Sequence, residues 1–276
     1  MSEKVMKVVF AFSAMFSVAA VAVICIFLLY NGVPAMREIG FFEFIGGKSW
    51  KPTEGQFGIF PMIVGSVYMT GGAIILGVPV ALLCAVFMTW FCPASIYRFF
   101  KPVVDLLAGI PSIVYGLFGY ILFVITLGWG YTLLSGAITL AVMILPLIMR
   151  TTEEALMSVP DSYREGSFGL GAGRLRTIFR IIIPAAVPGI AAGVILSIGR
   201  IVGESAALIF TAGTYPAVPD SLFASTRTLA VHMYALLTEG LYEKQAYATA
   251  VVLLVMVGLI NAASGILAKR LAKGGR

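Results

Sequence analysis

Two side chains of opposite charge lie four residues apart inside a long apolar run of the sequence. Arg200 and Glu204, followed by Ser205, interrupt the apolar run at about residues 181–211. If this run is one α-helix, the two charges share a helix face. Charged side chains in a membrane helix are costly and usually face a bundle interior or a wet cavity. Arg200, Glu204 and Ser205 are therefore candidates for a site within a membrane.

The pair fits two roles. A guanidinium group matches the oxygens of an oxyanion such as phosphate, and Glu204 could hold Arg200 in place or accept a proton from a protonated oxyanion. Alternatively, the two charges neutralise each other and fix two helices together. A helix counted from Pro188 places Arg200 about 18 Å along, near the membrane middle, whereas one counted from Ile181 places it toward the outer face.

A polar segment at residues 150–180 holds a second candidate site. Pro160-Asp161-Ser162 is typical of a helix start, and Glu165 follows Ser162 at the capping-box spacing. We expect this short helix to stop at the glycines between residues 169 and 173, which permit a sharp turn. Such a helix can fit a groove on a partner protein. The alternative is an amphipathic helix held by anionic lipid.

Sites for nucleotides and metals are not indicated. Gly46-Gly47-Lys48-Ser49 resembles the end of a phosphate-binding loop, but Phe42 stands where that motif requires glycine, and no strand precedes it. We therefore expect no ATP site in this chain. The three cysteines have the spacing of neither a disulfide framework nor a zinc site, so no metal is expected; they are Cys25, Cys84 and Cys92.

These candidates must be positioned by helices that cross a membrane. Of the 276 residues, 60% are hydrophobic and 12% are charged, about half the charged fraction of a soluble domain, and the mean hydropathy is +1.00. The sequence predicts an all-α integral membrane protein with one domain over residues 1–276. Asn31-Gly32-Val33-Pro34 should end the first helix. Six apolar runs are long enough to span a bilayer, at about residues 8–30, 61–91, 103–127, 131–149, 181–211 and 247–268.

Basic residues are distributed unevenly between the two sides of this topology. With the N-terminus inside, 13 of the 19 Lys and Arg residues lie on one side and five on the other, with Arg200 in the membrane. The positive-inside rule then places both termini and the 150–180 loop in the cytoplasm. The net charge of +6 is not concentrated on one face of a folded domain, so we expect no nucleic-acid partner.

The loop resembles the loop signature of ABC importer permeases. That signature has a fixed spacing, with alanines where this chain has Gly166 and Ser167 and leucine at Ile183. The matching positions are Glu165, Gly166, Ser167, Gly171, Ile181 and Pro184. From about residue 57 to 261 the chain resembles the permeases of the phosphate-specific (Pst) importer. Four segments carry this resemblance, at 106–116, 150–156, 159–166 and 199–205, with Ser205 where the family usually has threonine.

The resemblance implies a type I ABC importer permease (MetI-like) fold, with an N-terminal helix at about 8–30, a permease core at 61–268 and a cytoplasmic coupling loop at 150–180. It implies that Arg200, Glu204 and Ser205 line a pathway for phosphate. The implied partners are a second phosphate permease, two cytoplasmic ATPases that hold ATP and Mg, and an extracytoplasmic phosphate-binding protein. The implied location is a bacterial or archaeal cytoplasmic membrane.

Several alternatives stay open at this point. The chain has features of both the PstA and the PstC type, and the substrate could be another oxyanion such as molybdate or sulfate. A secondary carrier driven by an ion gradient, or a membrane enzyme or scaffold, is a further alternative.

His232 lies in an outer segment at about 214–246. We expect it to be a surface or packing residue, with a contact to the binding protein as the alternative.

Overall fold

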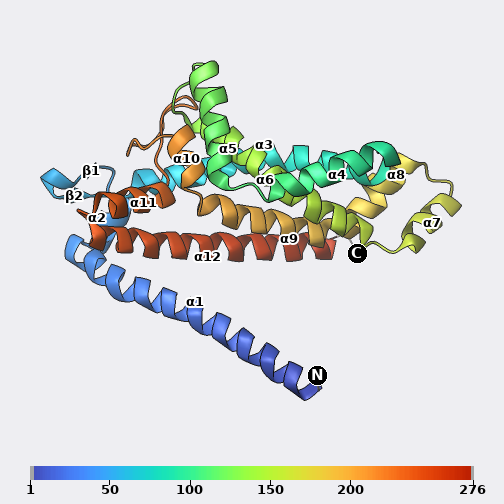
Figure 1. The fold of residues 1–276 in the computed structure, drawn as a ribbon, viewed down its shortest axis with the longest axis horizontal. Helices are drawn as coiled ribbons and strands as arrows, with labels where there is room; N and C mark the ends of the chain where they lie inside the picture. Colours follow the sequence, from blue (N-terminus) through green and yellow to red (C-terminus); the bar gives the residue numbers. More distant parts are fainter. Residues whose placement is uncertain (1–2, 275–276) are drawn as a thin grey trace.

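The computed structural model describes residues 3–274, a bundle of long helices (Figure 1). Residues 1–2 and 275–276, at the ends of the predicted domain, lie outside the described part. In chain order the helices are α1 (Glu3–Ile39), α2 (Phe41–Gly46), α3 (Phe60–Trp90), α4 (Ala94–Ala108), α5 (Ser112–Gly119), the π-helix η2 (Tyr120–Thr126), α6 (Leu133–Met157), α7 (Asp161–Gly169), α8 (Arg174–Thr177), the π-helix η3 (Ile178–Ile182), α9 (Ile183–Val202), α10 (Ala206–Thr211), α11 (Leu229–Glu239) and α12 (Glu243–Gly274).

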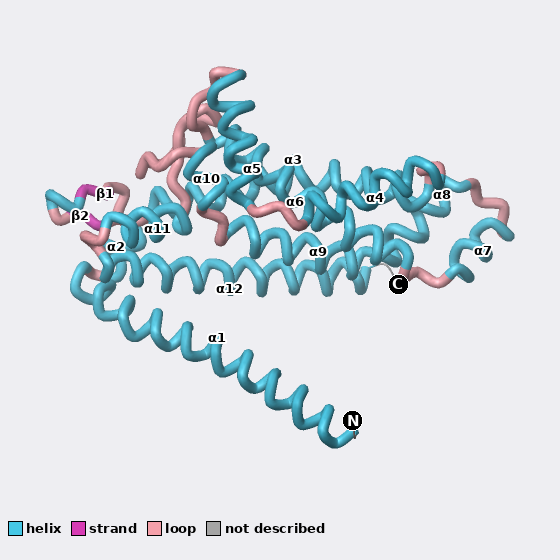
Figure 2. The backbone as a smooth tube through the Cα atoms, in the orientation of Figure 1, coloured by secondary structure: helices cyan, strands magenta, loops and turns pink. Residues whose placement is uncertain are grey.

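The sheet found within residues 3–274 is one short antiparallel hairpin of β1 (Trp50–Lys51) and β2 (Gln56–Phe57), joined by the 3-10 turn Pro52–Glu54. Trp50 pairs with Phe57, and Lys51 pairs with Gln56. The hairpin lies with α2 and α11 at one end of the bundle, which we call the hairpin end (Figure 2). The opposite end, which we call the loop end, carries α7 and α8 (Figure 1).

Five helices within the described residues are long and apolar enough to cross a membrane: α1, α3, α6, the continuous helix Arg174–Val202, and α12. The sixth predicted span is a bent pair, in which α4 meets the segment Ser112–Thr126 at 100°. Pro111 lacks a backbone N–H and disfavours helical backbone at Ile110, so the helix breaks there. The six-span fold is recovered when this pair counts as one span, and the bend falls at a proline inside the predicted third span.

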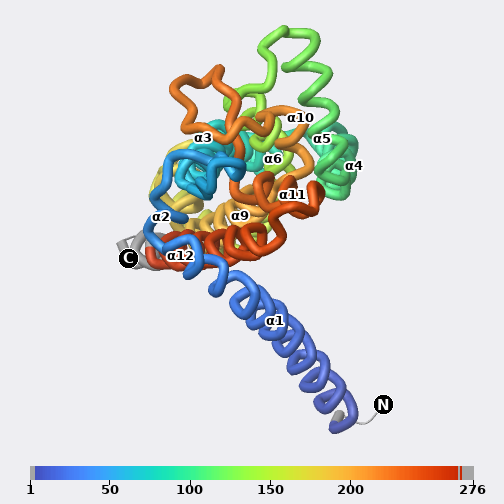
Figure 3. The backbone as a smooth tube through the Cα atoms, turned by 90° about the vertical axis from the view of Figure 1, so that its left-hand side faces the viewer, coloured from blue at the N-terminus to red at the C-terminus, as the bar shows by residue number. Residues whose placement is uncertain are grey.

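The first helix is longer than predicted. Asn31-Gly32-Val33-Pro34 does not end it, and α1 continues to Ile39. Packing on α12 overrides the local stop signal: a Cβ at Gly32 would lie 2.6 Å from the Tyr247 carbonyl oxygen, and Ala35 and Met36 are buried. The N-terminal part of α1 leaves the bundle at an angle (Figure 3), and its apolar side chains are exposed.

The central helix of the bundle is α6, whose side chains Leu140, Ile144 and Ile148 are fully buried in a core shared with α3, α9 and α10. The short helix α10 lies directly on α5. A Cβ at Gly116 of α5 would lie 2.7 Å from the Cα of Ala207, a distance that real side chains do not reach. The two backbones are therefore in direct contact, and this contact positions α10.

At the hairpin end, the ring of His232 is 0% exposed, so it is a packing residue and offers no surface to a binding protein. The edge of the ring meets Trp50, with ring centroids 4.2 Å apart. Arg227 donates a hydrogen bond to the Thr214 carbonyl at 2.7 Å, and its guanidinium lies 3.2 Å from His232 Nδ1. Burial, reinforced by the charge of Arg227, lowers the pKa of His232 to about 3.

This depressed pKa predicts how stability depends on pH. The fold holds the neutral ring, whereas the unfolded chain binds a proton with the ordinary pKa of 6.5. The contribution is therefore fully present above pH 6.5 and is lost as the pH falls from 6.5 toward 3. Over this window the wild type should lose on the order of 1 kcal/mol per pH unit more than His232→Asn, which cannot titrate.

Thermal unfolding of the purified chain in detergent, followed from neutral to acid pH, measures this difference. The asparagine side chain is the matched replacement because its carbonyl oxygen can still accept a hydrogen bond from Arg227. Parallel loss of stability in the wild type and in His232→Asn would show that His232 does not titrate with folding.

Candidate functional site

Arg200 lies in the last turn of α9. The helix that carries it begins at Arg174 and passes through Pro184 and Pro188 without interruption, so the helix does not start after Pro188. Arg200 lies about 39 Å along this helix at 1.5 Å per residue, at the end that points away from α7. Arg200 is half-buried and lies within electrostatic reach of Tyr115 on α5.

Glu204 does not continue the helix face of Arg200, so the prediction of an i, i+4 pair on one helix was wrong. Helix α9 ends at Val202, Gly203 follows, and α10 begins at Ala206. Glu204 is 9% exposed, and its Oε1 accepts the backbone N–H of Ala207 at 3.1 Å. The carboxylate thus caps α10, because the first N–H groups of a helix lack backbone partners.

Because of the break between the two helices, Arg200, Glu204 and Ser205 differ in the contacts that they make. No ion pair joins Arg200 to Glu204 or to another acid within residues 3–274, so Glu204 does not hold Arg200 in place. Ser205 is the N-cap residue of α10, and its carbonyl accepts the N–H groups of Leu208 and Ile209. Its hydroxyl forms no hydrogen bond to a described residue. A cation, a capping carboxylate and a hydroxyl therefore lie within one short stretch of chain.

The candidate loop site lies on α7 and the turn that follows it, at the tip of the loop end (Figure 1). Glu165 and Gly166 are exposed, whereas the Ser167 side chain is buried and its hydroxyl lies 2.8 Å from that of Thr177. Gly171 has a φ of +81°, a conformation that favours glycine. This hydrogen bond and turn fold the loop back onto α8.

Two details of the loop differ from expectation. The helix begins at Asp161 after Pro160 and has no side-chain cap, so the predicted capping box of Ser162 and Glu165 is absent. Pro184 is exposed and Ile181 is half-buried, and both lie in the continuous helix rather than in the loop. Only Glu165, Gly166, Ser167 and Gly171 are therefore brought together on the loop itself.

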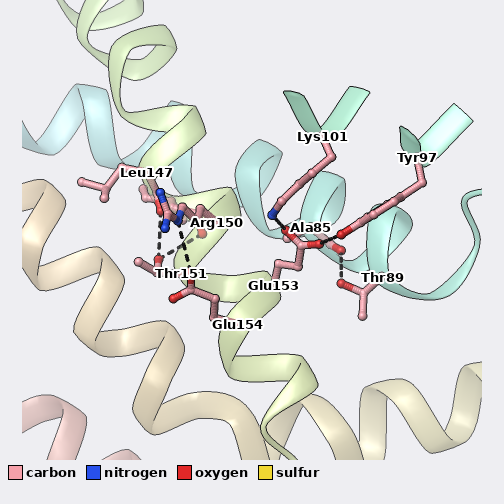
Figure 4. A network of polar contacts seen from close by, with 10 residues as sticks. Ala85, Thr89, Tyr97, Lys101, Leu147, Arg150, Thr151, Glu153 and Glu154 are labelled. Carbon is pink, nitrogen blue, oxygen red and sulfur yellow. Dashed lines mark hydrogen bonds and ion pairs between the residues drawn. The ribbon is translucent and has the colours of Figure 1, made fainter. Parts of the chain in front are cut away.

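The structure adds a buried charge that sequence reasoning left without a role. Glu153 on α6 is 6% exposed and is held by two residues of α4 (Figure 4). The Tyr97 hydroxyl donates to Glu153 Oε1 at 2.6 Å, and the Lys101 ammonium donates to Oε2. Glu153 stands in a segment that carries the family resemblance, 150–156, but its partners lie 52 and 56 residues away in the chain.

The same region holds two arginine contacts and a cavity. Arg174 donates to the carbonyl of Trp90 and lies 4.9 Å over the Phe91 ring, while Arg164 lies 5.7 Å over the Trp90 ring. Glu153 and both arginines line an open cavity of about 1000 Å³. Within residues 3–274 no group of three or more His, Cys, Asp or Glu side chains could hold a metal ion.

Known proteins similar to this chain are membrane permeases. Residues 77–274 match the family described as binding-protein-dependent transport system inner membrane component. The chain is 35% identical over 255 residues to the probable ABC transporter permease protein YqgI of Bacillus subtilis, covering 86% of this chain and 85% of the relative. It is 33% identical over 219 residues to the phosphate transport system permease protein PstA 1 of Mycobacterium tuberculosis (78% and 72%). It is 32% identical over 267 residues to PstC of Mesorhizobium japonicum (87% and 81%).

Solved structures share the fold at lower sequence identity. A bacterial alginate ABC transporter, in complex with a periplasmic protein that binds an alginate pentasaccharide, aligns with a TM-score of 0.66 at 18% identity, covering 98% of both chains. The inward-facing MetNI methionine ABC transporter aligns with a TM-score of 0.61 at 19% identity, covering 81% of this chain and 99% of the other.

The family match spans most of the chain, and relatives above 30% identity cover more than two thirds of it. The two solved transporter structures share the helical fold of this chain. The chain therefore belongs to the binding-protein-dependent family of ABC importer permeases, and within that family it is a multi-pass membrane subunit of the Pst type.

Proposed function

We propose that this permease forms half of the pathway of an ATP-driven importer for inorganic phosphate. The observation that carries the proposal is the half-buried Arg200, which has no acidic partner within residues 3–274 and lies beside the break that holds Glu204 and Ser205. A cation in apolar surroundings without a counter-ion favours the entry of an anion. The M. tuberculosis and M. japonicum relatives, both named phosphate permeases, support phosphate as this anion.

Glu204 gives the site a means of selection. One carboxylate oxygen accepts the Ala207 N–H, and the other forms no hydrogen bond to a described residue. Inorganic phosphate keeps a proton at neutral pH and can donate this O–H to the carboxylate. Sulfate and molybdate lack this proton and are repelled, so the same carboxylate attracts one oxyanion and excludes the others. The Ser205 hydroxyl supplies a further donor.

Energy would enter at the loop end, which we place in the cytoplasm. There α7 presents the exposed Glu165 to a groove on one of two ATPase subunits, which hold the ATP and Mg. Because one continuous helix runs from Arg174 to Val202, movement of the loop is carried directly to Arg200. A second permease subunit completes the pathway, and a phosphate-binding protein delivers the substrate at the hairpin end.

Replacement of Arg200 by glutamine tests the anion site. Arg200→Gln should assemble with its partners, but uptake of radiolabelled phosphate by the reconstituted complex should fall about tenfold or more, the scale expected when a charged hydrogen-bonding group is lost. Arg37→Gln is the matched control, because Arg37 is exposed in the last turn of α1. Full uptake by an assembled Arg200→Gln complex would leave Arg200 with a structural role only.

Charge reversal on α7 tests the docking of the ATPase. Glu165→Lys should reduce co-purification of the ATPase subunits about tenfold or more, because like charges at an interface cost several kcal/mol. Glu43→Lys makes the same charge change on the exposed surface of α2, at the hairpin end, and should leave co-purification intact. The docking role is wrong if Glu165→Lys assembles and transports as the wild type does.

A further inference from the structure

Helix α4 is attached to α6 through one polar contact, at Glu153. None of its residues, all of which the structure describes, is buried. Tyr97 and Lys101 lie one turn apart on the same face of α4, and both reach the carboxylate of Glu153 on α6 (Figure 4). A buried carboxylate is tolerated only when it is paired and hydrogen-bonded, so this contact fixes the point at which α4 rests on α6.

The neighbouring carboxylate shows what distinguishes Glu153. Glu154 pairs with Arg150 at 3.1 Å within α6, but the two side chains are 64% and 56% exposed. An exposed pair of this kind contributes little, and it joins no second helix. Glu153 differs because its side chain is 8% exposed and its partners belong to another helix.

The near end of α4 is attached to the coupling loop. Only three residues, Phe91 to Pro93, connect α3 to α4. Arg174 of α8 holds this turn through the Trp90 carbonyl and the Phe91 ring, and Arg164 of α7 lies over the Trp90 ring. These cation–π and hydrogen-bond contacts join both sides of the loop to the same turn, so displacement of α7 pulls on the start of α4.

The far end of α4 leads to Glu204. Beyond Ala108 the chain bends by 100° into α5, where Gly116 lies in direct contact with Ala207 of α10. Glu204 caps that helix. The loop therefore has two routes to the site: the continuous helix leads to Arg200, and α4, α5 and α10 lead to Glu204. Gly203 lies between the two end points.

We propose that Glu153 is a positioning residue that serves as the pivot of α4, so that movement of the coupling loop reaches Glu204 by a route separate from α9. The distance along α4 from Lys101 to its far end at Ala108 is about 10 Å, and the distance from Tyr97 to its near end at Ala94 is about 5 Å. A displacement at the turn before Ala94 therefore becomes a larger displacement at α5. The cavity beside the pivot leaves room for this tilt. The inference rests on the proposed coupling of this loop to an ATPase.

The test measures phosphate uptake and ATP hydrolysis in the same vesicles containing the full complex. Glu153→Gln should lower the phosphate carried per ATP hydrolysed by about fivefold or more, a typical coupling factor, while ATP hydrolysis continues. Glu154→Gln, the adjacent exposed carboxylate, should leave this ratio unchanged. The double variant Glu153→Lys with Lys101→Glu should restore most of the ratio that Glu153→Lys alone loses, because the Tyr97 hydroxyl can also accept from a lysine.

A wild-type ratio in Glu153→Gln, or a charge swap that restores nothing, would overturn the pivot. If Glu153→Gln fails to assemble, Tyr97→Phe tests the pivot instead, because it removes only the hydroxyl that donates to Glu153. An unchanged ratio of phosphate carried per ATP in Tyr97→Phe also overturns the inference. A wild-type complex that hydrolyses ATP without carrying phosphate would instead contradict the proposed substrate.

A distance measurement tests the pivot independently of the substrate. Spin labels at Leu106 on α4 and Met157 on α6, both exposed, in a chain whose three cysteines are serine, should show a shift on ATP binding that Glu153→Gln abolishes. The same shift in both proteins would contradict the pivot.

Discussion

The hydrogen bond from the Ala207 N–H to the Glu204 carboxylate is the interaction on which the candidate site depends. A helix that begins inside apolar surroundings leaves its first N–H groups without water, and each bare group is costly. The carboxylate of Glu204 satisfies one of them, which allows the chain to break after Val202 and to start again as α10. Beyond this break Glu204 forms no ion pair with Arg200, so Arg200 keeps a charge that no described acid neutralises.

The break also divides the site between two parts of the bundle. Arg200 ends a helix that starts in the loop end, whereas Glu204 belongs to α10, which rests on α5 through Gly116. A substrate bound by both residues would be held by two bodies that can shift relative to each other. An importer needs such a site, because an anion that is held firmly on one side of the membrane must be released on the other.

The features that could be predicted from the sequence are those fixed by local composition. The spans follow from the length of the apolar runs, and the turn at Gly171 follows from the need for positive φ. The end of α1 could not be predicted, because the stop signal at Asn31–Pro34 is overridden by contact with Tyr247, more than 200 residues away. The spacing of Arg200 and Glu204 fits an unbroken helix equally well, and Gly203 was the one local sign of a break.

The role of Glu153 lay beyond sequence reasoning for a related reason. Its segment was part of the family resemblance, but a glutamate followed by a second glutamate gives no sign of which side chain is buried. Glu153 is the buried one because Tyr97 and Lys101 of α4 contact its carboxylate. The bend at Pro111 had a clear local signal in the proline, whereas no local signal gives its angle of 100°.

The most direct test of the account is the substrate and energy source of the wild-type complex in proteoliposomes. Uptake of phosphate, sulfate and molybdate would be measured side by side, with and without ATP, for the complete complex and for this chain alone. The account predicts ATP-dependent uptake of phosphate by the complex only, with sulfate and molybdate excluded. Uptake of sulfate or molybdate without phosphate, or uptake by the chain alone driven by an ion gradient, would contradict it.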